Sequence, residues 1–443
     1  MNSRKLGPFD LTMIVISLVI GMGIFRTPVM VAASAANENV FYGAWLLGGL
    51  IALCGALTFA EIGSRLPVSG GYYRIFSYCY HPSFAFMLNC TILVSNAASV
   101  AGVALIGSEY ISGLFFDANH PHIESIRLWI GAGEILLFYG LNLLGLKTSA
   151  RTQNVLTMFK IGIVLLLCLA IFNPANGVAA PETLNVAAPS LTWKQILISL
   201  GACLIPISFT YGGYQQTINF GSEIENAPKV MPRGIILGMV VVIVLYMTIN
   251  YVYVSTIHFE HLGTSKNIAS ILAGNVLGDT GQKIFTLVFF LAVLAYVNVG
   301  LMSNPRVIVA MSEEKVLPEF LARKSKSHGV PTIALFGFTV LCLLIMYYAK
   351  VFDRIVNYVI FLDSLGLVAA ASTLFILRAR NTGEQLNPYK MKLFPVAPVF
   401  FMLAYAFVTF SIIYDNPWSM IWGLIVFFSF LPIYFILKYT RDA

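Results

Sequence analysis

The chain has 443 residues, of which 58% are hydrophobic and only 11% are charged, and its mean hydropathy is +0.81. Soluble domains carry about 25% charged residues, so this composition excludes a soluble enzyme or binding module and indicates a membrane protein with many spans. The formal net charge of +7 is explained by the distribution of the basic residues, described below.

Twelve stretches of about 20 apolar residues are long enough to cross a bilayer. They lie near residues 8–36, 41–65, 83–116, 124–145, 151–172, 192–221, 232–257, 281–309, 332–350, 354–378, 395–414 and 417–438. No connecting stretch is long enough for a soluble domain. We therefore expect an all-α membrane protein that forms one transmembrane domain.

Lys and Arg residues are distributed unequally between the two sides. With the N-terminus inside, 19 of the 27 fall in inner loops and six in outer loops, while Arg26 and Lys160 lie within spans. Positive residues concentrate in cytoplasmic loops, so we expect a multi-pass protein of the cytoplasmic (plasma or inner) membrane with both termini cytoplasmic. The bilayer is then the partner that the charge reflects, and no nucleic acid partner is expected.

Two spans are interrupted by glycine pairs. The first break lies at Gly21 and Gly23, and the second at Gly212 and Gly213. A helix in lipid must satisfy its own backbone groups, so a break indicates that the freed N–H and C=O groups face a protein cavity. Close helix packing is the structural alternative for the first pair taken alone.

The breaks divide the chain into two blocks of five spans, residues 8–172 and 192–378, and each block opens with a broken helix. Because five is odd, the second block enters the membrane from the opposite face. This pattern predicts a 5+5 inverted repeat with a substrate site between the broken helices. The spans in residues 395–438 stand outside the repeat, as scaffold or dimer surface.

The two breaks together offer two kinds of polar group. The N–H groups that begin the outer half-helix suit a carboxylate, and the last carbonyls before each break suit an ammonium group. Together they predict a site for a zwitterion such as an amino acid. The candidate substrate-binding residues are Val19, Ile20, Met22, Gly23, Ile24, Phe209, Thr210, Tyr211 and Gly212.

Lys160 lies nine residues past Arg151, so it is about 13 Å deep at 1.5 Å per residue. A cation at this depth is costly and by default functional. It can replace a bound sodium ion as a fixed positive charge, or carry a proton; an ion pair with an acid on a neighbouring span is the structural alternative. Asp363 is placed at similar depth by the same arithmetic, and can contact a substrate ammonium, carry a proton or pair with Lys160.

Other polar residues within the spans have no assigned place. Glu109 and Glu134 cannot be positioned relative to a cavity, and hydrogen bonding between helices is the favoured explanation for Asn298. The six cysteines show no metal-ligand spacing and no disulfide framework. No nucleophile pairs with a base, so we expect neither a cofactor nor an enzyme.

These motifs resemble the amino acid–polyamine–organocation (APC) superfamily, most closely the L-type and bacterial amino acid permeases, over roughly spans one to ten. The motifs that carry the resemblance are residues 20–28 (IGMGIFRTP), 61–71 (EIGSRLPVSGG), 209–213 (FTYGG) and 223–233 (EIENAPKVMPR). The resemblance implies a LeuT-like fold in which spans one, two, six and seven rock against a scaffold. It also implies that the N–H groups of Gly23 and Ile24 hold the substrate carboxylate and that Phe209 is a gate.

The resemblance further implies that Lys160 stands where related transporters bind sodium, with Asn298 on the facing eighth span as a coupling residue. Two positions depart from the family pattern: Met22 replaces a small hydroxyl residue, and Asp363 replaces a neutral polar one. We therefore expect a sodium-independent amino acid transporter, either an exchanger or a proton symporter, with neutral substrates. The alternatives are a proton-coupled carrier of cationic amino acids or polyamines, and a non-transporting amino acid sensor.

Overall fold

The computed structural model describes residues 5–21, 23–117, 120–169, 192–265, 268–325, 327–349, 352–415 and 417–442. Met22, one of the candidate site residues, lies outside these ranges. Within them the protein is helical, with isolated β-bridges between Leu6 and Ile224 and between Ser69 and Phe220. The all-α expectation is therefore confirmed for the described residues.

Ten of the described helices are long and apolar enough to cross a membrane, or up to eleven if the bent pair α1 (Pro8–Val19) and α2 (Gly23–Ser34) counts as one span. The ninth expected span corresponds to α12, which is shorter, so the count of twelve remains a prediction. The ten helices are α3 (Glu38–Arg65), α5 (Pro82–Ser112), α6 (Ile123–Leu143), α7 (Leu146–Cys168), α8 (Trp193–Tyr211), α9 (Ala227–Ile257), α11 (Ile268–Glu313), α13 (Phe352–Ala379), α14 (Val396–Asp415) and α15 (Pro417–Asp442), and the shorter α12 is Thr332–Ala349.

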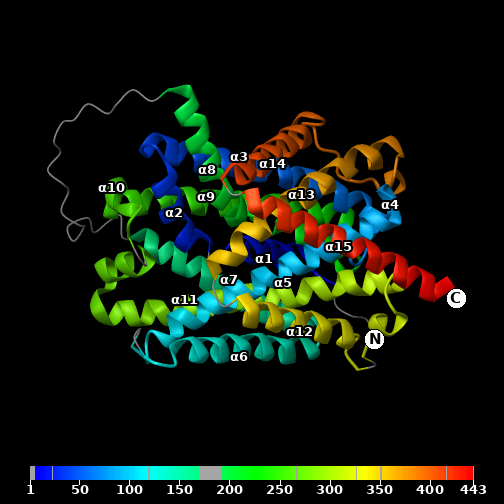
Figure 1. Ribbon diagram of the computed structural model, residues 1–443, viewed down its shortest axis with the longest axis horizontal. Helices are drawn as coiled ribbons and strands as arrows, with labels where there is room; N and C mark the ends of the chain where they lie inside the picture. The colour runs from blue at the N-terminus through cyan, green and yellow to red at the C-terminus, as the bar shows by residue number, and fades with distance from the viewer. Residues whose placement is uncertain are drawn as a thin grey trace.

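Short helices connect the long ones. They are α4 (Gly71–Cys79), α10 (Phe259–Leu262) and the 3₁₀ segments η3 (Tyr214–Asn219), η4 (Gly221–Glu223), η5 (Glu319–Ala322) and η6 (Glu384–Leu386). Cys79 ends α4 and is buried, because the apolar face of this helix packs on α5, α11 and α13. Both termini and α4 lie at the same end of the molecule (Figure 1).

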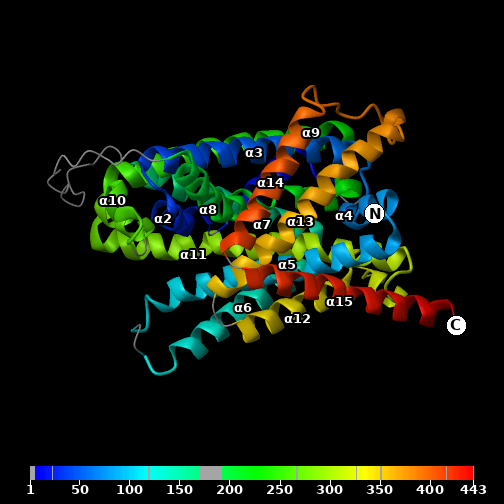
Figure 2. The ribbon, with the colours of Figure 1, turned by 45° about the horizontal axis from the view of Figure 1, so that its top comes forward.

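The long helices form two groups with α11 between them. Figure 2 shows α3, α8 and α9 on one side and α6, α12 and α15 on the other. Helix α3 packs along α9, and α11 packs along α5 and α7. By contrast, only 6% of the most apolar window of α15 is buried, so most of its apolar side chains face outward, where lipid is the solvent.

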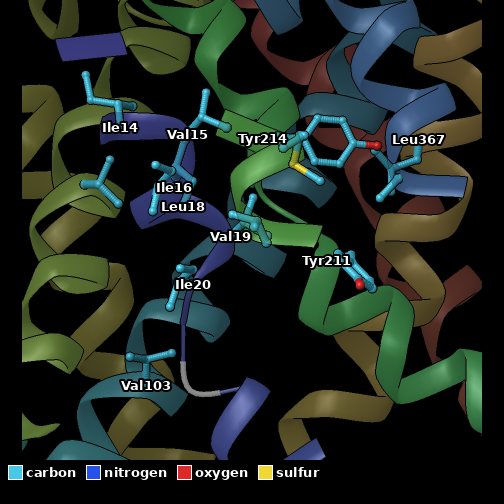
Figure 3. Packing of buried hydrophobic residues seen from close by; sticks show 14 of the residues in the cluster. Ile14, Val15, Ile16, Leu18, Val19, Ile20, Val103, Tyr211, Tyr214 and Leu367 are labelled. Atoms are coloured by element: carbon cyan, nitrogen blue, oxygen red, sulfur yellow. The ribbon is translucent and has the colours of Figure 1, made fainter. Parts of the chain in front are cut away.

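Helix α1 lies in the centre of the protein, since eight of its twelve residues are buried. Figure 3 shows its apolar side chains in one buried cluster with Val103 of α5, Tyr211 of α8 and Leu367 of α13, of which Leu367 lies beside Tyr214. The helix stops at Val19, because Ile20 has non-helical φ/ψ angles of −72° and 82°. The pair α1–α2 is bent by about 40°, so the expected break in the first span is present.

Candidate functional site

The two helix breaks lie against each other at their glycines. Gly213, after the end of α8, has a φ of +115°, and a Cβ atom there would lie 2.4 Å from the carbonyl oxygen of Leu18. A Cβ on Gly23 would lie 2.6 Å from the hydroxyl oxygen of Thr210. No side chain fits at either position, so the glycines allow the backbones of α1, α2 and α8 to approach closely.

Tyr246 of α9 connects the two breaks. Its hydroxyl group lies 2.9 Å from the carbonyl oxygen of Val19 and 3.3 Å from that of Thr210, and the side chain is fully buried. These are end carbonyls of two helices, which have no acceptor role inside their own helix. One phenol therefore stabilises the backbone of both breaks at once.

Lys160 of α7 contacts the end of α1. Its ammonium group donates to the carbonyl oxygens of Ile20 (2.5 Å) and Ser17 (3.1 Å) and to the Ser17 hydroxyl oxygen (3.2 Å), and the side chain is only 1% exposed. All of these acceptors are uncharged, so the described contacts contain no ion pair. The negative end of the α1 dipole supplies the compensating charge.

Among the described residues, Asn298 of α11 is linked to Lys160 through other side chains. Gln153 donates to the Ser17 hydroxyl, Asn298 donates to the Gln153 side-chain oxygen (2.7 Å), and Asn142 donates to Asn298 (3.0 Å). Every member of this chain is buried. This series of hydrogen bonds therefore links α6, α7 and α11 to α1, the helix that ends at the first break.

A small cavity of about 40 Å³ lies beside the two breaks. A buried water needs roughly 10–15 Å³ measured in this way, so the cavity has room for a few waters and not for an amino acid. Six of the candidate residues line it: Val19, Gly23, Phe209, Thr210, Gly212 and Asp363. Any larger ligand must therefore enter through a movement of the surrounding helices.

The remaining candidates lie outside the cavity lining. Ile24 is fully buried, the carbonyl of Ile20 is used by Lys160, and the ring of Tyr211 packs between Trp45 and Tyr246. Asp363 accepts a hydrogen bond from Ser95 at 2.5 Å, so the expected alternative of a pair with Lys160 is absent from the described contacts.

Comparison with known proteins assigns this arrangement to a family. The model of the amino acid permease family matches residues 6–437, nearly the whole chain. The chain belongs to the amino acid permease family. It is an amino acid transporter of the APC type and a multi-pass membrane protein, and the resemblance inferred from its motifs is confirmed.

The permease is similar to several curated transporters over almost its full length. It is 27% identical to the serine/threonine exchanger SteT of Bacillus subtilis, over 99% of this chain and 98% of that protein. It is 26% identical to the human cystine/glutamate transporter (96% and 83% covered) and 25% identical to the mouse large neutral amino acids transporter small subunit 2 (99% and 82% covered).

The backbone carbonyls expected to bind an ammonium group already have donors in the permease. The Val19 carbonyl accepts from the N–H of Gly21 at 2.7 Å as well as from Tyr246, and the Phe209 carbonyl accepts from Gly212 at 3.2 Å. The carbonyls of Ile20 and Thr210 are occupied by Lys160 and Tyr246, as described above. A substrate ammonium that binds here must therefore displace or share one of these donors.

Sequence reasoning missed several side chains of the site, and two tyrosines among them illustrate the reason. Tyr246 carries no motif, and Tyr405 of α14 lines the cavity although residues 395–438 were expected to form scaffold or dimer surface. Helix α14 reaches the site because it packs against α3, α8 and α13. Neither residue differs from the many other tyrosines of the chain except by position, so no sequence signal identifies them.

The acidic residues left unplaced by the sequence lie away from the cavity. Glu134 of α6 is buried beside Gly107 of α5, and neither of its oxygens has a hydrogen-bond partner in the described part of the chain. Glu109 lies 3.9 Å from Arg127, and both are partly exposed. Neither acid lines the cavity beside the breaks.

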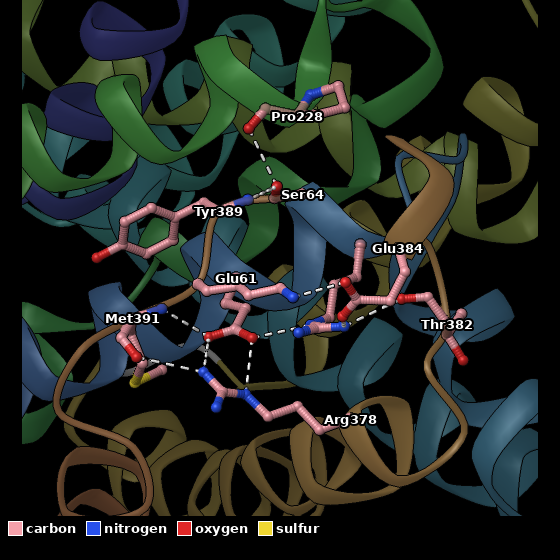
Figure 4. Close-up of polar contacts among 10 residues, drawn as sticks. Glu61, Ser64, Pro228, Arg378, Thr382, Glu384, Tyr389 and Met391 are labelled. Carbon is pink, nitrogen blue, oxygen red and sulfur yellow. Dashed lines mark hydrogen bonds and ion pairs between the residues drawn. The ribbon is translucent and has the colours of Figure 1, made fainter. Parts of the chain in front are cut away.

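A cluster of charged residues closes the end that carries the termini. Glu61 of α3 is fully buried and binds Arg378 of α13 through both oxygens (2.8 and 2.7 Å), Arg65 (2.8 Å) and the backbone N–H of Met391 (2.9 Å) (Figure 4). Arg65 also binds Glu384 at 3.0 Å. The cluster therefore holds α3, α13 and the α13–α14 loop together.

Proposed function

We propose that this permease is a sodium-independent amino acid exchanger that works by alternating access in the cytoplasmic membrane. The observation that carries the proposal is the position of the Lys160 ammonium group on the carbonyls of Ile20 and Ser17. Free carbonyls at a helix end form a site for a cation. Because a lysine occupies it, the transporter already contains the positive charge that a sodium ion would bring.

The proposed substrate is a neutral amino acid. Its carboxylate binds the N–H groups at the start of α2, at Gly23 and Ile24 together with Met22, because this end of the helix dipole favours an anion. Its ammonium group binds near the carbonyls that end α1 and α8. Phe209, beside the cavity, gates the path to the outside.

The architecture of the proposal is the 5+5 inverted repeat of residues 8–172 and 192–378, with broken helices 1 and 6 and the two spans of residues 395–438 outside it. The distribution of Lys and Arg favours cytoplasmic termini. Exchange is supported by the similarity to SteT, a serine/threonine exchanger. The small volume of the cavity supports a cycle that passes through a closed state.

Counterflow in proteoliposomes tests the proposal. Vesicles that contain the purified permease are loaded with an unlabelled amino acid or left empty, and uptake of a labelled panel is measured without sodium, with and without an inward proton gradient. We expect uptake that needs internal amino acid and ignores the gradient. Gradient-driven uptake into empty vesicles would instead show a proton symporter, and binding without flux would show a sensor.

One observation favours a second candidate, a proton-coupled carrier of cationic amino acids or polyamines. Asp363 lines the cavity and accepts from Ser95, and no ion pair of this carboxylate lies among the described residues. A cationic substrate would supply the positive partner of the Asp363 carboxylate. Competition by excess arginine or putrescine against a labelled neutral amino acid separates the two candidates, because only the second predicts stronger competition by the cations.

A further inference from the structure

A groove of about 850 Å³ lies on the outside of the protein, between the first turns of α9 and the loop that joins α13 to α14. On the α9 side it is lined by Lys229 and Arg233, followed by Ile236, Leu237 and Val240. Tyr389 and its two predecessors form the opposite wall. The groove is separate from the cavity at the helix breaks.

The two walls of the groove are fixed to each other by a buried hydroxyl group. Ser64 of α3 donates to the carbonyl oxygen of Pro228 at 3.0 Å and accepts from the backbone N–H of Tyr389 at 2.7 Å (Figure 4). Ser64 is fully buried. The groove is therefore a feature held by the fold and not an accidental gap between a helix and a loose loop.

The polar end of the groove has unbalanced positive charge. Lys229 and Arg233 are exposed and lie four residues apart on one face of α9. No acidic residue lines the groove, and among the described residues neither cation forms an ion pair. An anion is therefore the complementary group, and the adjacent N-terminus of α9 favours the same charge.

The apolar end continues along the membrane-facing side of α9. Leu237, Val240 and Val244 are 56%, 42% and 59% exposed. The eleven helical steps from Arg233 to Val244 rise about 16 Å at 1.5 Å per residue, which is roughly half of a ~30 Å hydrocarbon core. The cations and the apolar stripe thus match the headgroup and the acyl chains of one leaflet.

We propose that this groove binds an anionic phospholipid, with its phosphate on Lys229 and Arg233 and its acyl chains along the α9 stripe. Basic pockets between membrane helices are suited to anionic headgroups. A second copy of the permease is the poorer occupant, because a two-fold contact would place the same four cations against each other. A soluble anion would leave the apolar end unused.

The test measures lipid retention by the full-length permease in detergent. Equal amounts of dioleoyl phosphatidylglycerol and dioleoyl phosphatidylcholine are added, and bound lipid is counted by native mass spectrometry. We expect the wild type to prefer phosphatidylglycerol by about tenfold and the variant K229Q/R233Q to lose that preference. The variant K229R/R233K keeps both charges and should keep the preference.

The matched control is K147Q/R151Q. Lys147 and Arg151 are also exposed, also four residues apart, and also in the first turns of a long helix, α7, but they do not line the groove. This control should retain the lipid preference. Equal loss in both double variants, an unchanged preference in K229Q/R233Q, or displacement of the lipid by inorganic phosphate at the same concentration would each overturn the proposal.

If the double variant does not survive purification, the single variant K229Q provides the same test by lipid titration. Lys229 is exposed, so its replacement leaves the core intact, and a drop of about threefold in the preference is expected. An undiminished preference in a folded K229Q protein would count against the proposal in the same way. Folding of each variant is checked by its thermal unfolding midpoint.

Discussion

The ammonium group of Lys160 lies 2.5 Å from the carbonyl oxygen of Ile20, the first residue after the end of α1. Burial of an amine is costly unless its hydrogen bonds are made, and here three oxygens of α1 make them. Conversely, the lysine satisfies carbonyls that the broken helix leaves without a donor. The cation and the break therefore stabilise each other.

Replacement of Lys160 should test its two roles, the stabilisation of the helix break and the supply of a fixed positive charge. In K160A the carbonyls of Ile20 and Ser17 lose a charged donor, each worth about 1.5–3 kcal/mol, and we expect exchange to fall at least about tenfold. If the lysine stands in for sodium, added sodium should restore part of the exchange in K160A and leave the wild type unchanged. Initial rates in proteoliposomes measure both effects.

The control for this experiment is K147A, on the same helix. Lys147 is exposed near the start of α7, so its removal should leave exchange within about twofold of the wild type. Full activity of K160A without sodium would contradict the fixed-charge role. Loss of activity in both lysine variants would point to a general effect of charge.

The glycines of the first break give a second matched pair. In G23A the new methyl group would lie 2.6 Å from the Thr210 hydroxyl oxygen and 2.9 Å from its methyl carbon, whereas in G21A the nearest atom is a ring carbon of Tyr296 at 3.5 Å. Overpacking costs about 1–3 kcal/mol. We expect G23A to lower the thermal unfolding midpoint by several degrees and G21A to leave it nearly unchanged. Equal shifts would show that the breaks are not in close contact.

Sequence alone predicted those features that the bilayer imposes locally. Gly21 and Gly23 mark a break because lipid offers no partner for a freed backbone group, and Lys160 stands out because a cation at mid-depth needs a reason. The family assignment followed from the same motifs. In these cases the signal lies in one segment of the chain.

The residues that connect segments were not predicted. Gln153 joins Ser17 to Asn298, yet a glutamine in a membrane helix gives no indication of which helix it contacts. Tyr405 reaches the cavity only because α14 packs on α3 and α8. Such contacts depend on the packing of distant helices, which a single sequence does not reveal. The pairing of Asp363 with Ser95 is of the same kind.

Removal of the Glu61 carboxylate should be strongly destabilising. In E61Q the guanidinium groups of Arg65, which is 2% exposed, and Arg378 lose their shared anion. Removal of one partner from a buried ion pair costs about 3–5 kcal/mol, measured as the free energy of unfolding in detergent. K390A, which breaks the exposed contact to Glu384, should cost less than about 1 kcal/mol. Similar costs for the two variants would contradict the structural role of Glu61.

The contribution of Glu384 to stability should depend on pH. Hydrogen bonds from Lys390, which has the larger effect, and from Arg65 hold the pKa of this exposed carboxyl below its ordinary value. A lowered folded-state pKa means that the stabilisation is complete above the unfolded pKa of about 4.3 and is lost as the pH falls through the folded value. The unfolding midpoints of wild type and E384Q should therefore differ at pH 6, and the difference should shrink as the pH falls through the folded-state pKa. A constant difference across this range would contradict the assignment.

Tyr246 offers the sharpest test of the contact between the two breaks. Y246F removes the hydroxyl group that binds the carbonyls of Val19 and Thr210, and it leaves both buried acceptors without this donor, at a cost of about 1–3 kcal/mol. Tyr253 lies two turns further along α9, is equally buried, and has a hydroxyl group without a hydrogen-bond partner among the described residues. Y253F should therefore be neutral or slightly stabilising.

We expect Y246F alone to lower the unfolding midpoint and to slow exchange, since both breaks lose one shared anchor. If the two variants behave alike, the hydroxyl of Tyr246 does not hold the breaks together.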